Sequence, residues 1–419
     1  MAGTSGTRGG HWRWFFHVSE TRYGAGGPVQ GKRSYTCAQM KLRGFLFEGF
    51  AFAWLVVFVS GAAIGQLNKV VPPLHTDGHR IVDSAGHAVR LASVNWYGFD
   101  EKEYVAGGLN HQPLERIVAL IQQTGVNSVR IPWANETLER NPVAPEYAVT
   151  ANPQFKGKHA MEVMDAVVDA LTKARIMVIL DNHVSRADWC CNETDENGLW
   201  YSREYPEEKW LHDWSTIATR YRNNPWVVGA DLRNELRNGA TWGGADPKHD
   251  WHAAAERGGA AVLGGNPNLL VMVEGPKYST DLRGFDKLPV SLPIAHRLVY
   301  SPHAYSGSYG EHDERYEEQA GFLARMEPGV PVWFGEIGTC QKLDCGANSD
   351  WFKVFVRDVL GKNDAVSWSW WPLNGTQSGG ATRKFDEPET YGLLSTDYGS
   401  IAAPGVIGLL RTVGAGSGK

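Results

Sequence analysis

The chain has few cysteines and no CxxC pair, and its histidines are scattered along the sequence. Structural zinc sites draw on closely spaced Cys and His ligands, so we expect no metal, and a zinc site is the weaker alternative to disulfides. Outside the N-terminal segment the cysteines are Cys190, Cys191, Cys340 and Cys345. An even number predicts disulfides in an exported chain. We expect Cys340 to pair with Cys345, which leaves the adjacent Cys190 and Cys191 either bonded or free.

Positive charge is scarce beyond the N-terminal segment. The whole chain carries 41 basic and 46 acidic residues, a formal net charge of −5. Seven of the basic residues but only two of the acidic ones precede residue 66, so the remainder carries a net charge of −10. A surplus of negative charge opposes the binding of polyanions. We therefore expect no nucleic-acid partner and an uncharged substrate.

Charge is almost absent from residues 45–64, which are nearly all apolar. They follow Lys41 and Arg43, the order of a secretory signal, and small residues precede Gln66. We expect residues 1–65 to be a cleaved leader and the mature protein to be secreted and extracellular. Because about 20 apolar residues can span a bilayer, a membrane anchor formed by 45–64 is the alternative. Sequons that agree with a secreted glycoprotein occur at Asn135, Asn192 and Asn374.

No linker or internal repeat divides residues 66–419, so we expect one domain that acts as a monomer. Apolar, β-rich runs recur in it at Leu91–Val94, Val126–Ile131, Ile176–Leu180, Trp226–Leu232, Leu269–Val273, Leu298–Tyr300, Pro331–Phe334 and Ala365–Trp370. Helical patterns lie between them at Leu114–Gln123, His159–Ala174, Glu207–Arg222, His249–Leu263, Glu314–Met326 and Trp351–Leu360. Eight apolar runs that alternate with helical patterns predict an α/β fold, a (β/α)8 TIM barrel. A short N-terminal hairpin, His79–Asp83 with His87–Arg90, should close its bottom.

Two of the apolar runs end in glutamate. Asn234-Glu235 follows the fourth run, and Glu336 follows the seventh. The C-terminal strand ends of a barrel converge on one face, so the two glutamates should meet there. Burial at the edge of a core raises the pKa of a carboxyl group, and such a group can donate a proton. One protonated and one ionised carboxyl group can cleave a glycosidic bond, although either glutamate alone would more often be an ion-paired strand end.

Other strands should bring polar groups to the same face. Arg130 and the Tyr305 hydroxyl could hold Glu336 ionised, although a structural ion pair is the simpler reading of the arginine. Asn234 could bond the sugar 2-hydroxyl or merely cap its strand. Two strand-end histidines could bond hydroxyls or orient Glu235, or be satisfied core residues: His183 and His303.

The chain has 17 tryptophans, whose flat faces suit sugar rings. Those at strand ends or in the loops after them are candidate platforms for substrate: Trp96, Trp133, Trp189, Trp200, Trp242 and Trp371. Those in helical patterns are expected to pack in the core: Trp210, Trp214 and Trp251.

Together the strand-end motifs resemble glycoside hydrolase family 5, the cellulase family: Asn95-Trp96, Arg130-Ile131-Pro132, Asp181-Asn182-His183, Asn234-Glu235, His303-Ala304-Tyr305, Gly335-Glu336 and Trp371. The resemblance covers roughly residues 81–398. It implies that Glu235 on strand four is the acid/base and Glu336 on strand seven the nucleophile. It also implies a supporting shell of Arg130, His183, Asn234, His303, Tyr305 and Trp371. The leader and the Cys190-Cys191 loop depart from the family.

The resemblance implies a retaining, cofactor-free hydrolase of β-glucan or a related polysaccharide. An endo-β-1,4-glucanase is the first expectation. A β-mannanase or an exo-β-glucanase of the same family is the alternative. An inactive carbohydrate-binding protein is the rival from another class, and the matched pair of glutamates disfavours it.

Overall fold

The computed structural model describes residues 70–191, 194–309 and 315–414. The expected leader, residues 1–65, lies outside these ranges, as does the sequon asparagine Asn192. Among the described residues, no helix combines the length and the apolar character that a bilayer span requires.

The core of the fold is a parallel sheet whose strands follow one another in the order β8-β7-β6-β5-β4-β3-β11-β10-β9. Their bounds are β3 (Ala92–Asn95), β4 (Ser128–Ala134), β5 (Met177–Val184), β6 (Val227–Asp231), β7 (Leu270–Glu274), β8 (Leu298–Ser301), β9 (His303–Ala304), β10 (Trp333–Ile337) and β11 (Ser367–Trp370). Because Pro302 has no backbone N–H, it separates β8 from β9, which form one strand in two pieces. A parallel bridge between Tyr300 and Val332 joins the two ends of the sheet. The predicted (β/α)8 barrel is confirmed.

Several strands extend further toward their C-terminal ends than the apolar runs predict. Pro132 pairs with Asp181 and Trp133 with Asn182 in the ladder between β4 and β5. All residues of both strands are buried, the polar ones included. Polar side chains can end a buried strand here because they form hydrogen bonds with other buried polar groups.

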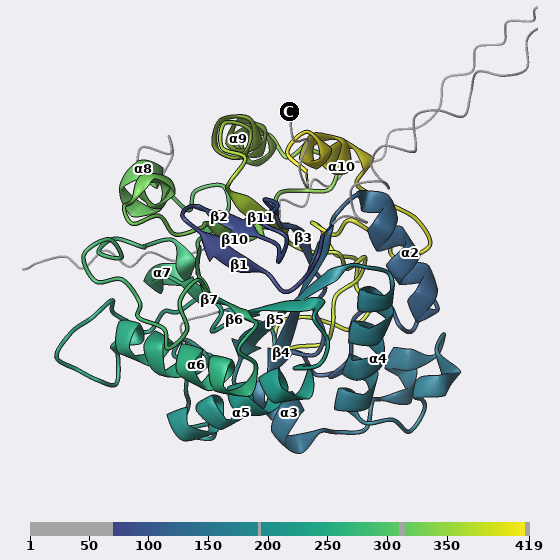
Figure 1. Ribbon diagram of the computed structural model, residues 1–419. Coiled ribbons are helices and arrows are strands. Elements are labelled where there is room, and N and C mark those ends of the chain that lie inside the picture. The colour runs from purple at the N-terminus through teal and green to yellow at the C-terminus, as the bar shows by residue number, and fades with distance from the viewer. Residues whose placement is uncertain (1–69, 192–193, 310–314, 415–419) are drawn as a thin grey trace, which may run out of the picture. The chain divides into compact units, whose positions relative to one another are not determined.

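Helices surround the strands (Figure 1). The longer ones are α2 (Leu114–Thr124), α4 (Ala160–Lys173), α5 (Glu207–Arg220), α6 (Trp251–Gly265), α9 (Ala347–Phe355) and α10 (Pro404–Arg411). The shorter ones are α3 (Asn135–Arg140), α7 (Pro276–Ser279) and α8 (Tyr316–Gln319), with 3₁₀ turns at Glu146–Val149, Pro153–Phe155 and Gly321–Arg325 and a π turn at Val356–Leu360. Their apolar faces and the outward faces of the strands form the main core, which includes Trp210, Trp214 and Trp251 as predicted.

Two helix predictions are corrected. The helix expected over Glu314–Met326 is only α8 followed by a 3₁₀ turn, because Ala320 leaves the helical conformation with φ −145°. The C-terminal α10 was not expected, since glycines dilute its apolar pattern. It forms because Val406, Ile407 and Leu410 are buried against the barrel.

The N-terminal hairpin is present but begins earlier than predicted. Its strands are β1 (His75–Asp77) and β2 (Arg80–Val82), which pair antiparallel. The expected return at residues 84–86 survives only as a bridge between Val82 and Ala88. The hairpin closes one end of the barrel, since its apolar side chains pack with inward-facing strand residues such as Met177, Leu270 and Trp333.

Candidate active site

The two predicted catalytic glutamates lie at the same end of the barrel. Glu336 belongs to β10, and Glu235 lies in the turn after β6. A carboxylate oxygen of one lies within 4.8 Å of a carboxylate oxygen of the other. The Glu235 side chain is 16% exposed and the Glu336 side chain 6%. Two carboxyl groups in different environments therefore face each other, as the sequence predicts.

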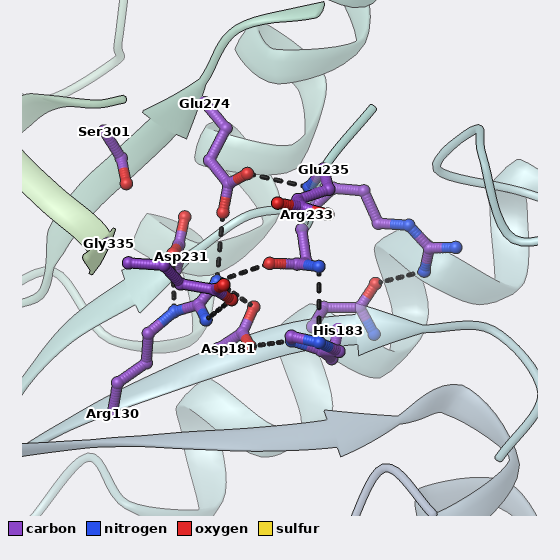
Figure 2. A network of polar contacts seen from close by, with 12 residues as sticks. Arg130, Asp181, His183, Asp231, Arg233, Glu235, Glu274, Ser301 and Gly335 are labelled. Atoms are coloured by element: carbon purple, nitrogen blue, oxygen red, sulfur yellow. Dashed lines mark hydrogen bonds and ion pairs between the residues drawn. The ribbon is translucent and has the colours of Figure 1, made fainter. Parts of the chain in front are cut away.

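Arg130 is the centre of a buried network behind these glutamates (Figure 2). Its guanidinium lies 2.9 to 3.1 Å from Asn95, Asp181, Asp231, Asn234, Glu274 and Glu336. Burial alone would lower the pKa of Arg130, but the carboxylates raise it well above its usual value. The oxygens of Asp181, Asp231 and Glu274 lie close enough together to hold a metal ion, and the guanidinium is the cation that they surround.

Burial and two polar partners act in opposite directions on Glu336. Arg130 Nη1 donates to Glu336 Oε1 at 2.9 Å, and the Tyr305 hydroxyl donates to Oε2 at 2.7 Å. Both contacts are the predicted ones. Burial nevertheless raises the pKa of Glu336 above its usual value, although His303 and Arg130 oppose this shift. Arg130 therefore limits the rise of this pKa and does not lower it below the usual value.

His303 lies between the two glutamates. Its Nδ1 is 3.1 Å from Glu235 Oε1 and 3.8 Å from Glu336 Oε2. Gly335 makes room for its ring, because a Cβ there would lie 2.9 Å from His303 Nε2. The prediction that this histidine orients Glu235 agrees with these contacts.

His183 does not contact Glu235 in this way. Its Nδ1 lies 2.6 Å from Asp181 Oδ2, and its Nε2 lies 3.3 Å from Asn234 Nδ2. Burial alone would lower the pKa of His183, but Asp181 raises it above its usual value. The ring stacks on Trp371, with centroids 5.4 Å apart. His183 therefore supports Asn234 and Trp371, the predicted sugar contact and platform.

Three tryptophans predicted to bind substrate are corrected. Trp200 is fully buried, and its indole donates to Glu207 Oε2. Trp96 and Trp133 are each only 1% exposed and belong to the main core. The Trp96 indole donates to Gly107 O, and Trp133 packs edge-on against Trp214. At 1% exposure these two indoles have no face to offer a sugar ring, whereas Trp371 is 7% exposed. By contrast, Trp189 and Trp242, in loops after strands, are partly exposed.

The network also contains two carboxyl groups that were not predicted from the sequence, those of Asp231 and Glu274. Asp231 ends β6 and Glu274 ends β7, and both are buried. Burial and the nearby Glu274 raise the pKa of Asp231 well above its usual value, while Arg130 opposes this rise. Glu274 follows an apolar run just as Glu336 does, so the same sequence signal could have found it.

The structure places the sulfur of Cys340 against that of Cys345, and the sulfur of Cys190 against that of Cys191. Cys191 Sγ lies 3.2 Å from Glu235 Oε2, so the unusual loop adjoins the site. Two predicted glycosylation sites are corrected. Asn135 and Asn374 are fully buried, so their amides are out of reach of a transferase in the folded chain.

Comparisons with known proteins agree with this geometry. Residues 82–377 match the family model for cellulase, glycosyl hydrolase family 5. An endoglucanase of Paenibacillus polymyxa is 29% identical over 77% of this chain and 83% of its own. The major extracellular endoglucanase of Xanthomonas campestris is 30% identical over 80% of this chain and 70% of its own.

Solved structures give the same result. The catalytic domain of the major Xanthomonas campestris endoglucanase superposes with a TM-score of 0.70 at 28% identity, covering 81% of this chain and 99% of that one. An endocellulase of Pyrococcus horikoshii superposes with a TM-score of 0.71 at 26% identity, covering 82% and 99%. The family model spans most of the chain and includes both glutamates, and the chain belongs to glycosyl hydrolase family 5.

Proposed function

We propose that this glycosyl hydrolase is a retaining endo-β-1,4-glucanase. The observation that carries the proposal is the close approach of Glu235 and Glu336, within 4.8 Å at one barrel mouth. Retaining enzymes hold their two carboxyl groups about 5 to 5.5 Å apart, whereas inverting enzymes need roughly 6.5 to 9.5 Å to admit a water. The endo mode and the glucan substrate are supported by relatives that are named endoglucanases.

In the first step, Glu336 attacks the anomeric carbon while Glu235 protonates the leaving oxygen. A glycosyl-enzyme forms on Glu336 and the shortened glucan departs. In the second step, Glu235 takes a proton from water, which attacks the same carbon and releases Glu336. Configuration is retained because each step inverts it once.

Neighbouring groups favour this division of roles. Arg130 and Tyr305 donate to the two oxygens of Glu336, which stabilises its ionised form. His303 contacts the more exposed Glu235. Asn234 and Trp371 lie beside His183, where they would hold the sugar 2-hydroxyl and the ring face.

Product sizing on a panel of β-glucan, mannan and xylan oligosaccharides tests the substrate class. We expect internal cleavage of the β-1,4-glucan with a spread of product sizes. Preferred cleavage of mannan would favour a β-mannanase, and release of single end units would favour an exo-β-glucanase. Binding without turnover would favour the inactive carbohydrate-binding protein.

We further propose that the enzyme is secreted as a monomer after removal of residues 1–65, with its paired cysteines oxidised outside the cell. The order of basic, apolar and small residues before Gln66 supports this proposal. N-terminal sequencing of exported protein should give a start near Gln66. Recovery of an intact 45–64 segment in the membrane fraction would contradict it, and size-exclusion chromatography tests the monomer.

A further inference from the structure

Glu274 joins three parts of the site that come from other strands, and Figure 2 shows its contacts with Glu235 and Arg130. Its Oε2 accepts a hydrogen bond from the backbone N–H of Glu235 at 2.7 Å. Its Oε1 accepts one from Arg130 Nη2 at 3.0 Å and forms an ion pair with His303 Nε2 at 3.3 Å. The side chain is fully buried at the end of β7, so it lies behind the site and cannot reach substrate.

The contact with Glu235 holds a backbone conformation that the residue would otherwise avoid. Glu235 has φ +45°, in the left-handed region that is disfavoured for residues other than glycine. The Glu274 carboxylate accepts its N–H, and Arg237 Nη1 donates to its carbonyl oxygen at 2.9 Å. Charged groups thus fix the peptide units on both sides of Glu235, and this turn aims its side chain at the cleft.

The contact with His303 completes the charge environment of that imidazole. Carboxyl groups face it from three elements: Glu235 after β6, Glu274 on β7 and Glu336 on β10, with Asp231 of β6 nearby. Burial alone would lower the pKa of His303, but Glu274 and Glu336 raise it well above its usual value. In turn, His303 and Arg130 overcome the effect of burial and lower the pKa of Glu274 to about 2.

We propose that Glu274 is a positioning residue, which fixes the turn of Glu235 and keeps His303 a cation between the acid/base and the nucleophile. This inference rests on the proposed function, since it assigns Glu235 and Glu336 those roles. A cationic His303 stabilises the ionised form of Glu336. If the charge of Glu274 is lost, His303 gives up its proton at a lower pH. The site then loses a positive charge within the pH range in which the enzyme is active.

The test compares the intact enzyme with Glu274→Gln, which keeps the shape and an acceptor oxygen but removes the charge. With cellotetraose as substrate, we expect kcat to fall roughly ten- to hundredfold and KM to change less than about twofold, because the loss falls on the transition state. The alkaline limb of the pH profile should move to lower pH. Asp281→Asn is the matched control, because Asp281 also pairs with cations, Lys277 and Arg283, but away from the site.

A second variant separates positioning from folding. Glu274→Asp keeps the charge but is one methylene shorter, so it should lower kcat and leave the alkaline limb near its wild-type position. If Glu274→Gln fails to fold, this variant still decides the question: an alkaline limb displaced toward lower pH would overturn the proposal. An unchanged profile and kcat in a folded Glu274→Gln would overturn it too.

Histidine NMR gives a readout that needs no turnover. In ¹⁵N-labelled protein, with His303 assigned through His303→Gln, we expect the ring to stay protonated at pH 7 in the wild type. Its midpoint should lie at least about one pH unit lower in Glu274→Gln. An unmoved midpoint would refute the role of Glu274, whereas a wild-type enzyme that cleaves no β-glycan would refute the proposed function instead.

Discussion

Glu336 and Glu235 occupy different environments, and their roles should separate under mutation. Glu336→Ala should abolish hydrolysis of all substrates yet transfer glycosyl units from an α-configured cellobiosyl fluoride, because the small side chain leaves space for fluoride at the nucleophile position. Glu235→Ala should lose roughly 10² to 10⁴ in rate on cellotetraose but spare the first step for activated aryl leaving groups, which need no proton. Rate assays with the three substrates test this. Equal losses of Glu235→Ala on cellotetraose and on the activated aryl substrate would contradict the assignment.

The Tyr305 hydroxyl should set the acidic limb of activity. It donates to Glu336 Oε2, and burial already raises the pKa of Glu336. Glu336 must be ionised to act, so activity falls as the pH drops through this pKa. Tyr305→Phe removes a donor to the carboxylate, which raises the pKa further and shifts the acidic limb to higher pH. A hydrogen bond to a charged group is worth about 1.5 to 3 kcal/mol, so kcat/KM should drop roughly ten- to hundredfold.

The pH profile of kcat/KM measures both effects. Tyr221→Phe is a matched control, because the Tyr221 hydroxyl also donates to a carboxylate, Asp165, but between α4 and α5. It should leave the profile unchanged. If the acidic limb of Tyr305→Phe coincides with that of the wild type, Tyr305 does not act through Glu336.

At this scale the sequence predicts the groups that share a chemical pattern and misses those that depend on packing. Glu235, Glu336 and Tyr305 follow apolar runs and Arg130 lies near the end of one, and the strand ends of a barrel bring them together. The direction in which Trp96 points depends on which side chains fill the space behind its strand, and no residue pattern carries that information. The net pKa shift of Glu336 likewise depends on its degree of burial.

At the scale of elements, two glycines should respond to alanine in opposite directions. Gly125 ends α2 with φ +88°, a left-handed conformation in which alanine is strained. Gly125→Ala should therefore lower stability by about 1 kcal/mol. Gly408 lies within α10, and a Cβ there would meet no atom within 4 Å. Gly408→Ala should raise stability by roughly 0.5 to 1 kcal/mol.

Thermal unfolding of the two variants beside the wild type measures both signs. Shifts in the same direction would show that backbone conformation does not govern the response at these two positions. Strands were easier to predict than such helix details, because each apolar run must be buried on both faces of the sheet. Several strands end later than the apolar runs predict, since buried polar residues such as Asp181, which pairs with Pro132, extend the ladder.

For the whole molecule, part of the acid sensitivity of the fold should come from Asp281. Lys277 and Arg283 outweigh partial burial and lower the pKa of Asp281 from 3.8 to about 2. A lowered pKa stabilises the fold fully above the unfolded value, and this contribution is lost as the pH falls from about 4 to about 2. Asp281→Asn should therefore lower stability by roughly 0.5 to 1 kcal/mol at neutral pH and by almost nothing below pH 2.

Denaturant unfolding as a function of pH tests this, with Asp286→Asn as the control because Asp286 is exposed in the same loop region. A stability difference that stays constant from pH 7 to pH 2 would contradict the assignment to Asp281.

The whole barrel was predictable because the same sequence pattern, an apolar run followed by a helical segment, recurs along the chain. Eight apolar runs and the helical patterns between them leave few other topologies, and the motifs at successive strand ends agree on one mouth. The observed N-terminal hairpin begins several residues before the predicted one. Short antiparallel strands are specified by a few contacts, such as that between β1 and Val82. The close approach of the two glutamates depends on the turn after β6, which no strand pattern specifies.

The anomeric configuration of the first product tests the central claim most directly. Proton NMR of cellotetraose hydrolysis, recorded before mutarotation, distinguishes the two outcomes. Attack by Glu336 followed by attack of water should give the β-anomer first, because two inversions restore the starting configuration. Appearance of the α-anomer first would show a single displacement by water and would contradict the assignment of Glu336 as the nucleophile.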